Sequence, residues 1–149
     1  MAEPRDAVAR KSDTLAMLAT PAIDVWVATA SGAGAPYLVP LSLAWVDERV
    51  VIAVDGSSPT ARNLTASGEA RLAVGPTRDV VMIDAALEKD VGVESDGALG
   101  AAYAAQADWD PRGNTGYRFL VLRPVRVQAW REVNELSGRT LMRGATWLV

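Results

Sequence analysis

The sequence contains no cysteine and no histidine among its 149 residues. The absence of cysteine excludes disulfide bonds, thiolate catalysis and thiolate-ligated metals. The absence of histidine removes the most common general base at neutral pH and the most common ligand of zinc, copper and iron, and it excludes a Ser-His-Asp triad. Only carboxylates and carbonyls remain as metal ligands, and no loop has the spacing of a calcium site. We therefore predict no metal site.

Concentrated basic charge and long apolar runs are also lacking. The formal net charge is -3, the sequence pI is about 4.9, and the arginines are interleaved with acidic residues. Nucleic-acid binding needs a concentrated basic face, so we expect no nucleic-acid partner. No segment approaches the roughly 18 to 20 apolar residues that span a membrane, and the N-terminal segment lacks the apolar centre of a signal peptide. We expect no membrane partner and a cytoplasmic location.

The composition is that of an ordinary globular chain. Half of the residues are hydrophobic and 22% are charged, a balance typical of proteins with one packed core. No repeat, low-complexity segment or linker interrupts the chain. Its length suits one domain, so we expect residues 1–149 to form a single unit.

Apolar periodicity predicts a mainly β chain with two or three helices. Helices are expected over residues 5–19, over 58–68 with Ser58 as the N-cap and Pro59 in the first turn, and over 95–108. About six strands are expected, over residues 23–31, 36–46, 49–54, 70–75, 79–88 and 117–130. Because short connections dominate and no βαβ rhythm occurs, the pattern favours a small antiparallel β-barrel with helices at its ends.

The strand predicted over residues 36–46 has two apolar faces. Its alternating sets, one through Val39 and Leu41 and the other through Leu38 and Pro40, are both largely apolar. An antiparallel strand with one solvated face instead alternates apolar with polar residues. We therefore expect one face to cover the core and the other to meet a helix, a second subunit or a ligand.

Two local features of the C-terminal half predict details of the backbone. Pro124 interrupts the strand over residues 117–130, and proline there predicts a bulge or an edge position. The segment Trp109 to Arg112 is interpreted as a loop tied down by Asp110 and Arg112, in preference to a lid over a cleft.

The segment GSSPTARNL, residues 56–64, follows an apolar strand and opens a helix. Ser58 and Pro59 are ordinary capping residues, so the segment can be a capped turn and nothing more. The same helix start offers N–H groups and a partial positive charge to an anion such as a cofactor phosphate. Taken alone, these residues leave both interpretations open.

Two patterns resemble those of the pyridoxamine 5'-phosphate oxidase-like split-barrel superfamily, which binds flavin or deazaflavin cofactors. The first is ATxxxxGxPxxxP at residues 28–40, and the second is SxTxRNL at residues 58–64. Their spacing, with one strand between them, carries the resemblance. It covers residues 25–88 well and residues 117–130 more loosely, and with it we prefer the phosphate-binding interpretation of the turn.

The resemblance implies a fold, an assembly and a cofactor. The fold is α+β, mainly β with α: a six-stranded antiparallel split β-barrel with flanking helices. It forms a homodimer with the cofactor in clefts at the subunit interface. The cofactor is FMN or, as the alternative, the deazaflavin coenzyme F420, and it supplies the hydride chemistry, so no catalytic side chain is expected.

The implied function is that of an FMN-dependent oxidoreductase acting on a small-molecule redox substrate. A deazaflavin-dependent reductase, a non-catalytic flavin carrier and a structural dimer without a ligand are the alternatives. The resemblance also implies where the cofactor binds: along one strand, at the end of the next, at the turn, and at two C-terminal residues. These residues are Val39, Pro40, Leu41, Ser42, Ala53, Val54, Ser57, Ser58, Thr60, Arg62, Asn63, Trp130 and Arg143.

The sequence departs from the family at the phosphate and substrate ends. Many flavin-binding members carry Lys or Arg where Thr60 stands and another basic residue near Val39. Fewer charge-assisted hydrogen bonds imply weaker phosphate binding, unless Arg62 or an arginine of the partner substitutes. The chain also lacks the C-terminal Arg-x-His arrangement that holds the substrate in the true oxidase, so pyridoxamine phosphate oxidase activity is not expected.

Overall fold

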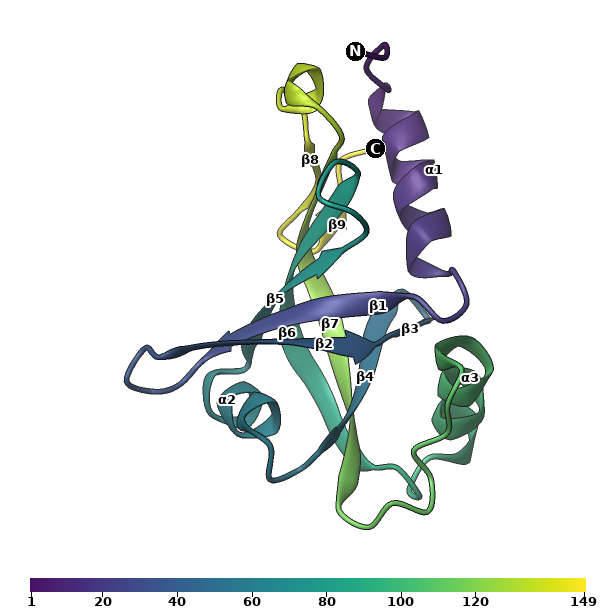
Figure 1. Ribbon diagram of the computed structural model, residues 1–149, viewed down its shortest axis with the longest axis vertical. Coiled ribbons are helices and arrows are strands. Elements are labelled where there is room, and N and C mark those ends of the chain that lie inside the picture. Colours follow the sequence, from purple (N-terminus) through teal and green to yellow (C-terminus); the bar gives the residue numbers. More distant parts are fainter.

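The computed structural model describes residues 1–149 and is built on one antiparallel sheet with three α-helices (Figure 1). The helices are α1 (Ala7–Leu18), α2 (Pro59–Ser67) and α3 (Gly97–Ala107), and a short 3-10 helix spans Val133–Glu135. The strands are β1 (Asp24–Ala30), β2 (Pro36–Ser42), β3 (Ala44–Val46), β4 (Arg49–Asp55), β5 (Glu69–Val74), β6 (Val80–Gly92), β7 (Tyr117–Trp130), β8 (Thr140–Arg143) and β9 (Thr146–Trp147).

The sheet curls into a barrel that does not close. The strand order is β2-β1-β5-β6-β7-β4-β3, and the β8–β9 hairpin is attached to β7. β2 and β3 stand at opposite ends of this order, although only Leu43 separates them in the sequence. The sheet must therefore bend until its two edges meet at Leu43. This unclosed antiparallel barrel with helices confirms the predicted split-barrel fold.

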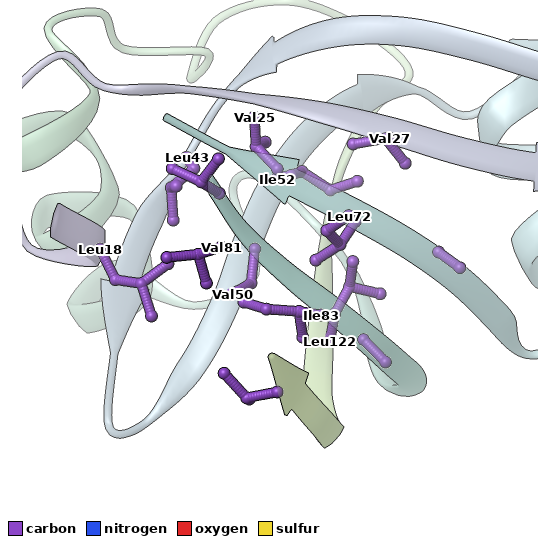
Figure 2. Close-up of a cluster of buried hydrophobic side chains, with 14 of the residues drawn as sticks. Leu18, Val25, Val27, Leu43, Val50, Ile52, Leu72, Val81, Ile83 and Leu122 are labelled. Atoms are coloured by element: carbon purple, nitrogen blue, oxygen red, sulfur yellow. The ribbon is translucent and has the colours of Figure 1, made fainter. Parts of the chain in front are cut away.

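The barrel interior holds one large apolar cluster (Figure 2). Val25 and Val27 of β1 face Leu72 of β5, Ile83 of β6 and Leu122 of β7 across it, and Leu18 of α1 closes one end. A smaller cluster lies outside the barrel, where α3 covers β3 and β4. β4 is thus buried on both faces, which explains why its sequence is a continuous apolar run.

Most predicted local features are confirmed. The Ser58 Oγ accepts a hydrogen bond from the Ala61 amide at 3.2 Å, and Gly68 ends α2 in the left-handed conformation with φ of 73°. The register between β6 and β7 shifts opposite Pro124, as a bulge requires. The Arg112 guanidinium binds Asp110 at 2.8 Å, so the segment after α3 is the tied loop that the sequence predicted.

Two predictions about strands were wrong. The strand expected over residues 36–46 is broken at Leu43, whose buried side chain marks the corner between the sheet edges. The chain has nine strands instead of six, because β3 separates from β2 and because the C-terminal segment adds β8 and β9. The short β8–β9 hairpin has weak apolar alternation, and it forms because β7 offers a partner strand.

A buried ion pair fixes α1 and the N-terminal segment to the C-terminal part of the chain. Glu135 is 2% exposed, and its carboxylate accepts hydrogen bonds from the Arg5 guanidinium and from the Arg5 and Arg131 amides, all at 2.8 to 3.1 Å. The hydrogen bonds from the Arg5 side chain are the main cause that lowers the pKa of Glu135 to about 2.

None of the three helices is both long and apolar enough to cross a membrane.

Glu135 makes acid stability testable. Its pKa is depressed in the folded state, so its contribution is complete above the unfolded value of 4.5 and is lost as the pH falls toward about 2. A depression of this size corresponds to about 3 kcal/mol. We expect Glu135→Gln to be less stable at pH 7 and to lose less stability than the wild type between pH 4.5 and 2, measured by urea unfolding.

Glu132→Gln is the matched control, because Glu132 pairs with the exposed Arg78 at the surface. It should affect the unfolding free energy much less. Equal pH dependence in wild type and Glu135→Gln would contradict the assignment of the acid-sensitive step to Glu135.

Candidate functional site

The predicted flavin strand, β2, lies at the edge of the sheet and pairs only with β1. Val39 and Leu41 turn inward and pack against the barrel core. Leu38, which is 59% exposed, and Pro40 face outward. Trp26 of β1 stands directly opposite Pro40 and is 49% exposed. We call Trp26, Leu38 and Pro40 the outer β2 face; no helix of the chain covers it.

The two predicted residues at the end of β4 point to opposite sides of the sheet. Val54 belongs to the interior cluster against which Val39 and Leu41 pack. Ala53 lies outside the barrel in the cluster that contains Tyr103 of α3. The Tyr103 hydroxyl donates to the Ser42 carbonyl at 3.4 Å, and burial raises the pKa of this phenol to about 12. Ala53 and Ser42 are therefore already engaged by α3.

The turn before α2 satisfies most of its own hydrogen-bond donors. The Asp55 carboxylate accepts from the Ser57 amide at 2.8 Å and from the Ser57 hydroxyl at 2.7 Å, and these bonds lower the pKa of Asp55. The amides of Gly56, Ser58, Ala61 and Arg62 also have acceptors within the chain. Asp55 thus takes the place that an anion would occupy beside the Ser57 amide.

Of the remaining predicted residues of α2, two contact the rest of the protein and one is exposed to solvent. Thr60 is 3% exposed, so its hydroxyl is turned into the protein. The Asn63 amide donates to the Thr29 hydroxyl at 3.1 Å and ties α2 to β1. Arg62 is exposed and makes no ion pair. It is the only cation among the predicted phosphate ligands.

The structure does not bring Trp130 and Arg143 to this turn. Trp130 ends β7, where the Arg139 guanidinium lies 4.9 Å from its ring centre. Arg143 is exposed at the end of β8. β8 lies in the upper half of Figure 1, whereas α2 lies at the lower left. Within one chain these two residues belong to a different region of the surface.

Sequence reasoning missed three features of this region: the Asp55 carboxylate, the Tyr103 contact and a surface hollow of about 640 Å³. The hollow lies beside the Asn63–Thr29 bond, between β1, the C-terminal end of α2, β5 and β6. Small side chains line it, among them Ala28, Ala30, Ala70, Ala85 and Ala86. The sequence did contain a signal for this hollow: alanines recur in β1, β5 and β6, and small side chains leave space above a sheet.

No protein-family model matches the chain, and no curated protein matches it. Solved structures do. The chain is similar to an F420 reductase, with a TM-score of 0.63 and 18% identity over 75% of this chain and 93% of that one. It is similar to a heme-binding protein from Mycobacterium smegmatis, with a TM-score of 0.63 and 21% identity over 94% of this chain. The chain spans 58% of the length of that protein.

A third structure with the same architecture is a candidate pyridoxamine 5'-phosphate oxidase from Listeria innocua. Its TM-score is 0.62 and its identity 10%, over 84% of this chain and 98% of that chain. These likenesses show the fold: the chain has the same split-barrel architecture as these structures. The same architecture occurs in a protein described as a reductase and in one described as binding heme.

The two neighbouring residues Arg62 and Asn63 should differ in their structural importance. Asn63→Ala removes the bond between α2 and β1, which should cost about 1 kcal/mol of unfolding free energy. Arg62→Ala removes an exposed side chain without a partner and should change that energy by less than about 0.5 kcal/mol. Chemical denaturation of both variants measures this. A loss for Arg62→Ala as large as that for Asn63→Ala would show that Arg62 has a structural role.

Proposed function

We propose that the chain binds a flavin-type cofactor and is an oxidoreductase that acts on a small-molecule substrate. The split-barrel fold, shared with proteins described as an F420 reductase and a candidate pyridoxamine 5'-phosphate oxidase, carries this proposal. FMN is the first candidate cofactor and the deazaflavin coenzyme is the second. A bound flavin supplies the hydride chemistry, while the protein binds and orients the ring and keeps water away from it.

The outer β2 face supports binding of a flat ring. It combines the large Trp26 surface with Leu38 and Pro40, and the unpaired edge of β2 adds free backbone groups beside it. Flavin sites need an apolar wall with a few polar groups at its rim. One chain provides only one such wall, and the ring would remain exposed on its other side.

The phosphate end fits FMN less well than the ring end does. A phosphate at the start of α2 would gain Arg62 but would lie beside the negatively charged Asp55, which already holds the Ser57 amide. The like charge weakens binding of a dianion. The side chains of Val39 and Thr60 are neutral and add no positive charge at this position. These two observations keep the deazaflavin coenzyme as the second candidate, because its acidic tail extends beyond the phosphate and can bind elsewhere on the protein.

We do not propose heme for this chain. Heme iron is most often held by His or by a Cys thiolate, and the sequence contains neither residue.

We further propose that residues 1–149 act as one unit that pairs with a second copy. Leu38 and Trp26 are large exposed apolar side chains at diagonal positions on two paired strands. Such a patch is typical of an interface. A second chain placed over it would cover the apolar surface and supply the missing wall of the cofactor site.

Parallel titrations with FMN and with the deazaflavin coenzyme, followed by fluorescence, test the cofactor. Loss of the Arg62 charge should weaken FMN binding about tenfold in Arg62→Ala. Removal of the opposing charge in Asp55→Asn should strengthen it about fivefold. Binding of the deazaflavin alone would select the second candidate, and binding of neither would reject the proposal. A bound flavin that neither NADH nor NADPH reduces would indicate a carrier without turnover.

Self-association is tested separately with Leu38→Glu. A charge placed in the centre of the outer β2 face should convert a dimer into a monomer, as measured by light scattering. Val8→Glu is the matched control, because Val8 is a similarly exposed apolar residue on α1. A wild type that is monomeric at all concentrations, or a dimer that persists in Leu38→Glu, would contradict the assigned interface.

A further inference from the structure

A second hollow, of about 240 Å³, lies on the outer surface of the sheet near the C-terminal end of β7. Val127 and Ala129 of this strand point into the barrel, so Arg126, Gln128 and Trp130 point outward. Arg71 and Asp84 reach the hollow from β5 and β6, and Arg139 reaches it from the segment before β8. Apart from Met82, every residue that lines the hollow is polar, charged or aromatic: Arg71, Asp84, Arg126, Gln128, Trp130 and Arg139.

The lining carries an excess of positive charge. Three arginines face one carboxylate, which leaves two unmatched positive charges in a chain whose formal net charge is -3. Asp84 is occupied by Arg71, whose Nε lies 2.6 Å from the Asp84 Oδ1. Arg126 stands opposite Asp84 in the β6–β7 register, yet neither Arg126 nor Arg139 makes an ion pair.

The neighbouring carboxylates do not supply the missing charge. Glu132 binds Arg78 at 3.0 Å, and Asp79 lies between Arg5 and Arg131 at 3.6 and 3.3 Å. Each acid near the end of β7 therefore already has a basic partner. The Arg126 and Arg139 guanidinium groups thus have no acidic partner within the chain and are free to bind an anion from solution.

Two of the lining side chains are held in place before any ligand arrives. The Arg139 guanidinium packs over the Trp130 ring at 4.9 Å, a cation–π contact that restricts its orientation. The Gln128 amide donates to the Thr140 hydroxyl at 3.1 Å. Ordered donors lose less entropy when a ligand binds, so these contacts favour recognition of a specific group.

We propose that this hollow binds the phosphate group of a phosphorylated small molecule. Two guanidinium groups can each present paired N–H donors, which suits an oxyanion with several oxygens, and their charge of two matches that of a phosphate monoester. The hollow is smaller than the roughly 300 to 1,000 Å³ of sites that enclose a drug-sized ligand. It therefore takes the anionic group alone.

The rest of the ligand has an adjoining place. Arg71 and Asp84 also line the alanine-rich hollow of about 640 Å³ beside α2, so the two hollows meet at this ion pair. A ligand whose phosphate lies between Arg126 and Arg139 can extend across the pair and place an apolar body over the small side chains. The site thus selects a phosphate ester with a compact apolar or aromatic body.

Titration of the intact protein with inorganic phosphate and with phenyl phosphate, at ionic strength balanced by KCl, tests the site. Calorimetry should show saturable binding at one site per chain, tighter for phenyl phosphate. Arg126→Gln and Arg139→Gln should each weaken it at least about tenfold, the effect of losing charge-assisted hydrogen bonds. Arg123→Gln is the matched control, an unpaired arginine of the same strand outside the hollow, and should change the Kd by less than about twofold.

Several outcomes would overturn the assignment. Absence of saturable binding would do so, and so would an equal loss in Arg123→Gln, because net charge alone would then explain it. The third is a loss of self-association in Arg126→Gln with an unchanged Kd for phosphate, which would assign the hollow to an acidic residue of a second copy.

A further titration, in which FMN is added to the phosphate-bound protein, identifies which ligand carries the phosphate group. Competition between phosphate and FMN would mean that the hollow holds the phosphate of the cofactor, and simultaneous binding would mean that it serves a substrate. Both results support the site. If phosphate binds while FMN and the deazaflavin do not, the site stands and the flavin proposal fails.

Discussion

The architecture depends on one constraint: the two edges of the sheet must meet at Leu43. β2 and β3 are the end strands of the hydrogen-bonded order, yet a single residue separates them in the chain. The sheet can satisfy both conditions only by curling around its interior. The curl encloses one apolar cluster and fixes Leu43 at a fully buried corner. Removal of this apolar surface from water stabilises the curled sheet over an open one.

The curl also determines which surfaces remain for function. β4 is buried on both sides over Val50 to Val54, by the barrel interior and by α3, and it reaches solvent only at its two ends. β2 is buried on one side and exposed on the other, which leaves Trp26 and Leu38 uncovered. The barrel therefore presents an apolar strand edge that no helix of the chain covers.

Charge is distributed unevenly over this scaffold. The start of α2, where the resemblance places a phosphate, has its own carboxylate in Asp55 and a single free cation in Arg62. The hollow at the end of β7 has the opposite balance, with Arg126 and Arg139 free of acidic partners. Anions are favoured where positive charge is unmatched and donors are ordered. This difference in charge is the reason that we propose a second phosphate site, at the end of β7.

The sequence by itself determined the features that depend on neighbouring residues. The Ser58 cap, the end of α2 at Gly68 and the bulge at Pro124 were all predicted, because backbone conformation and capping bonds act over a few positions. The contact of Asp55 with Ser57 escaped prediction even at short range, since a side chain there can face either solvent or the turn. The break at Leu43 and the pairing of β8 with β7 were decided by the tertiary structure. The tertiary structure also decided which arginines have no acidic partner. Asp84 pairs with Arg71 and leaves Arg126 unpaired, and this arrangement exists only when β5, β6 and β7 lie side by side.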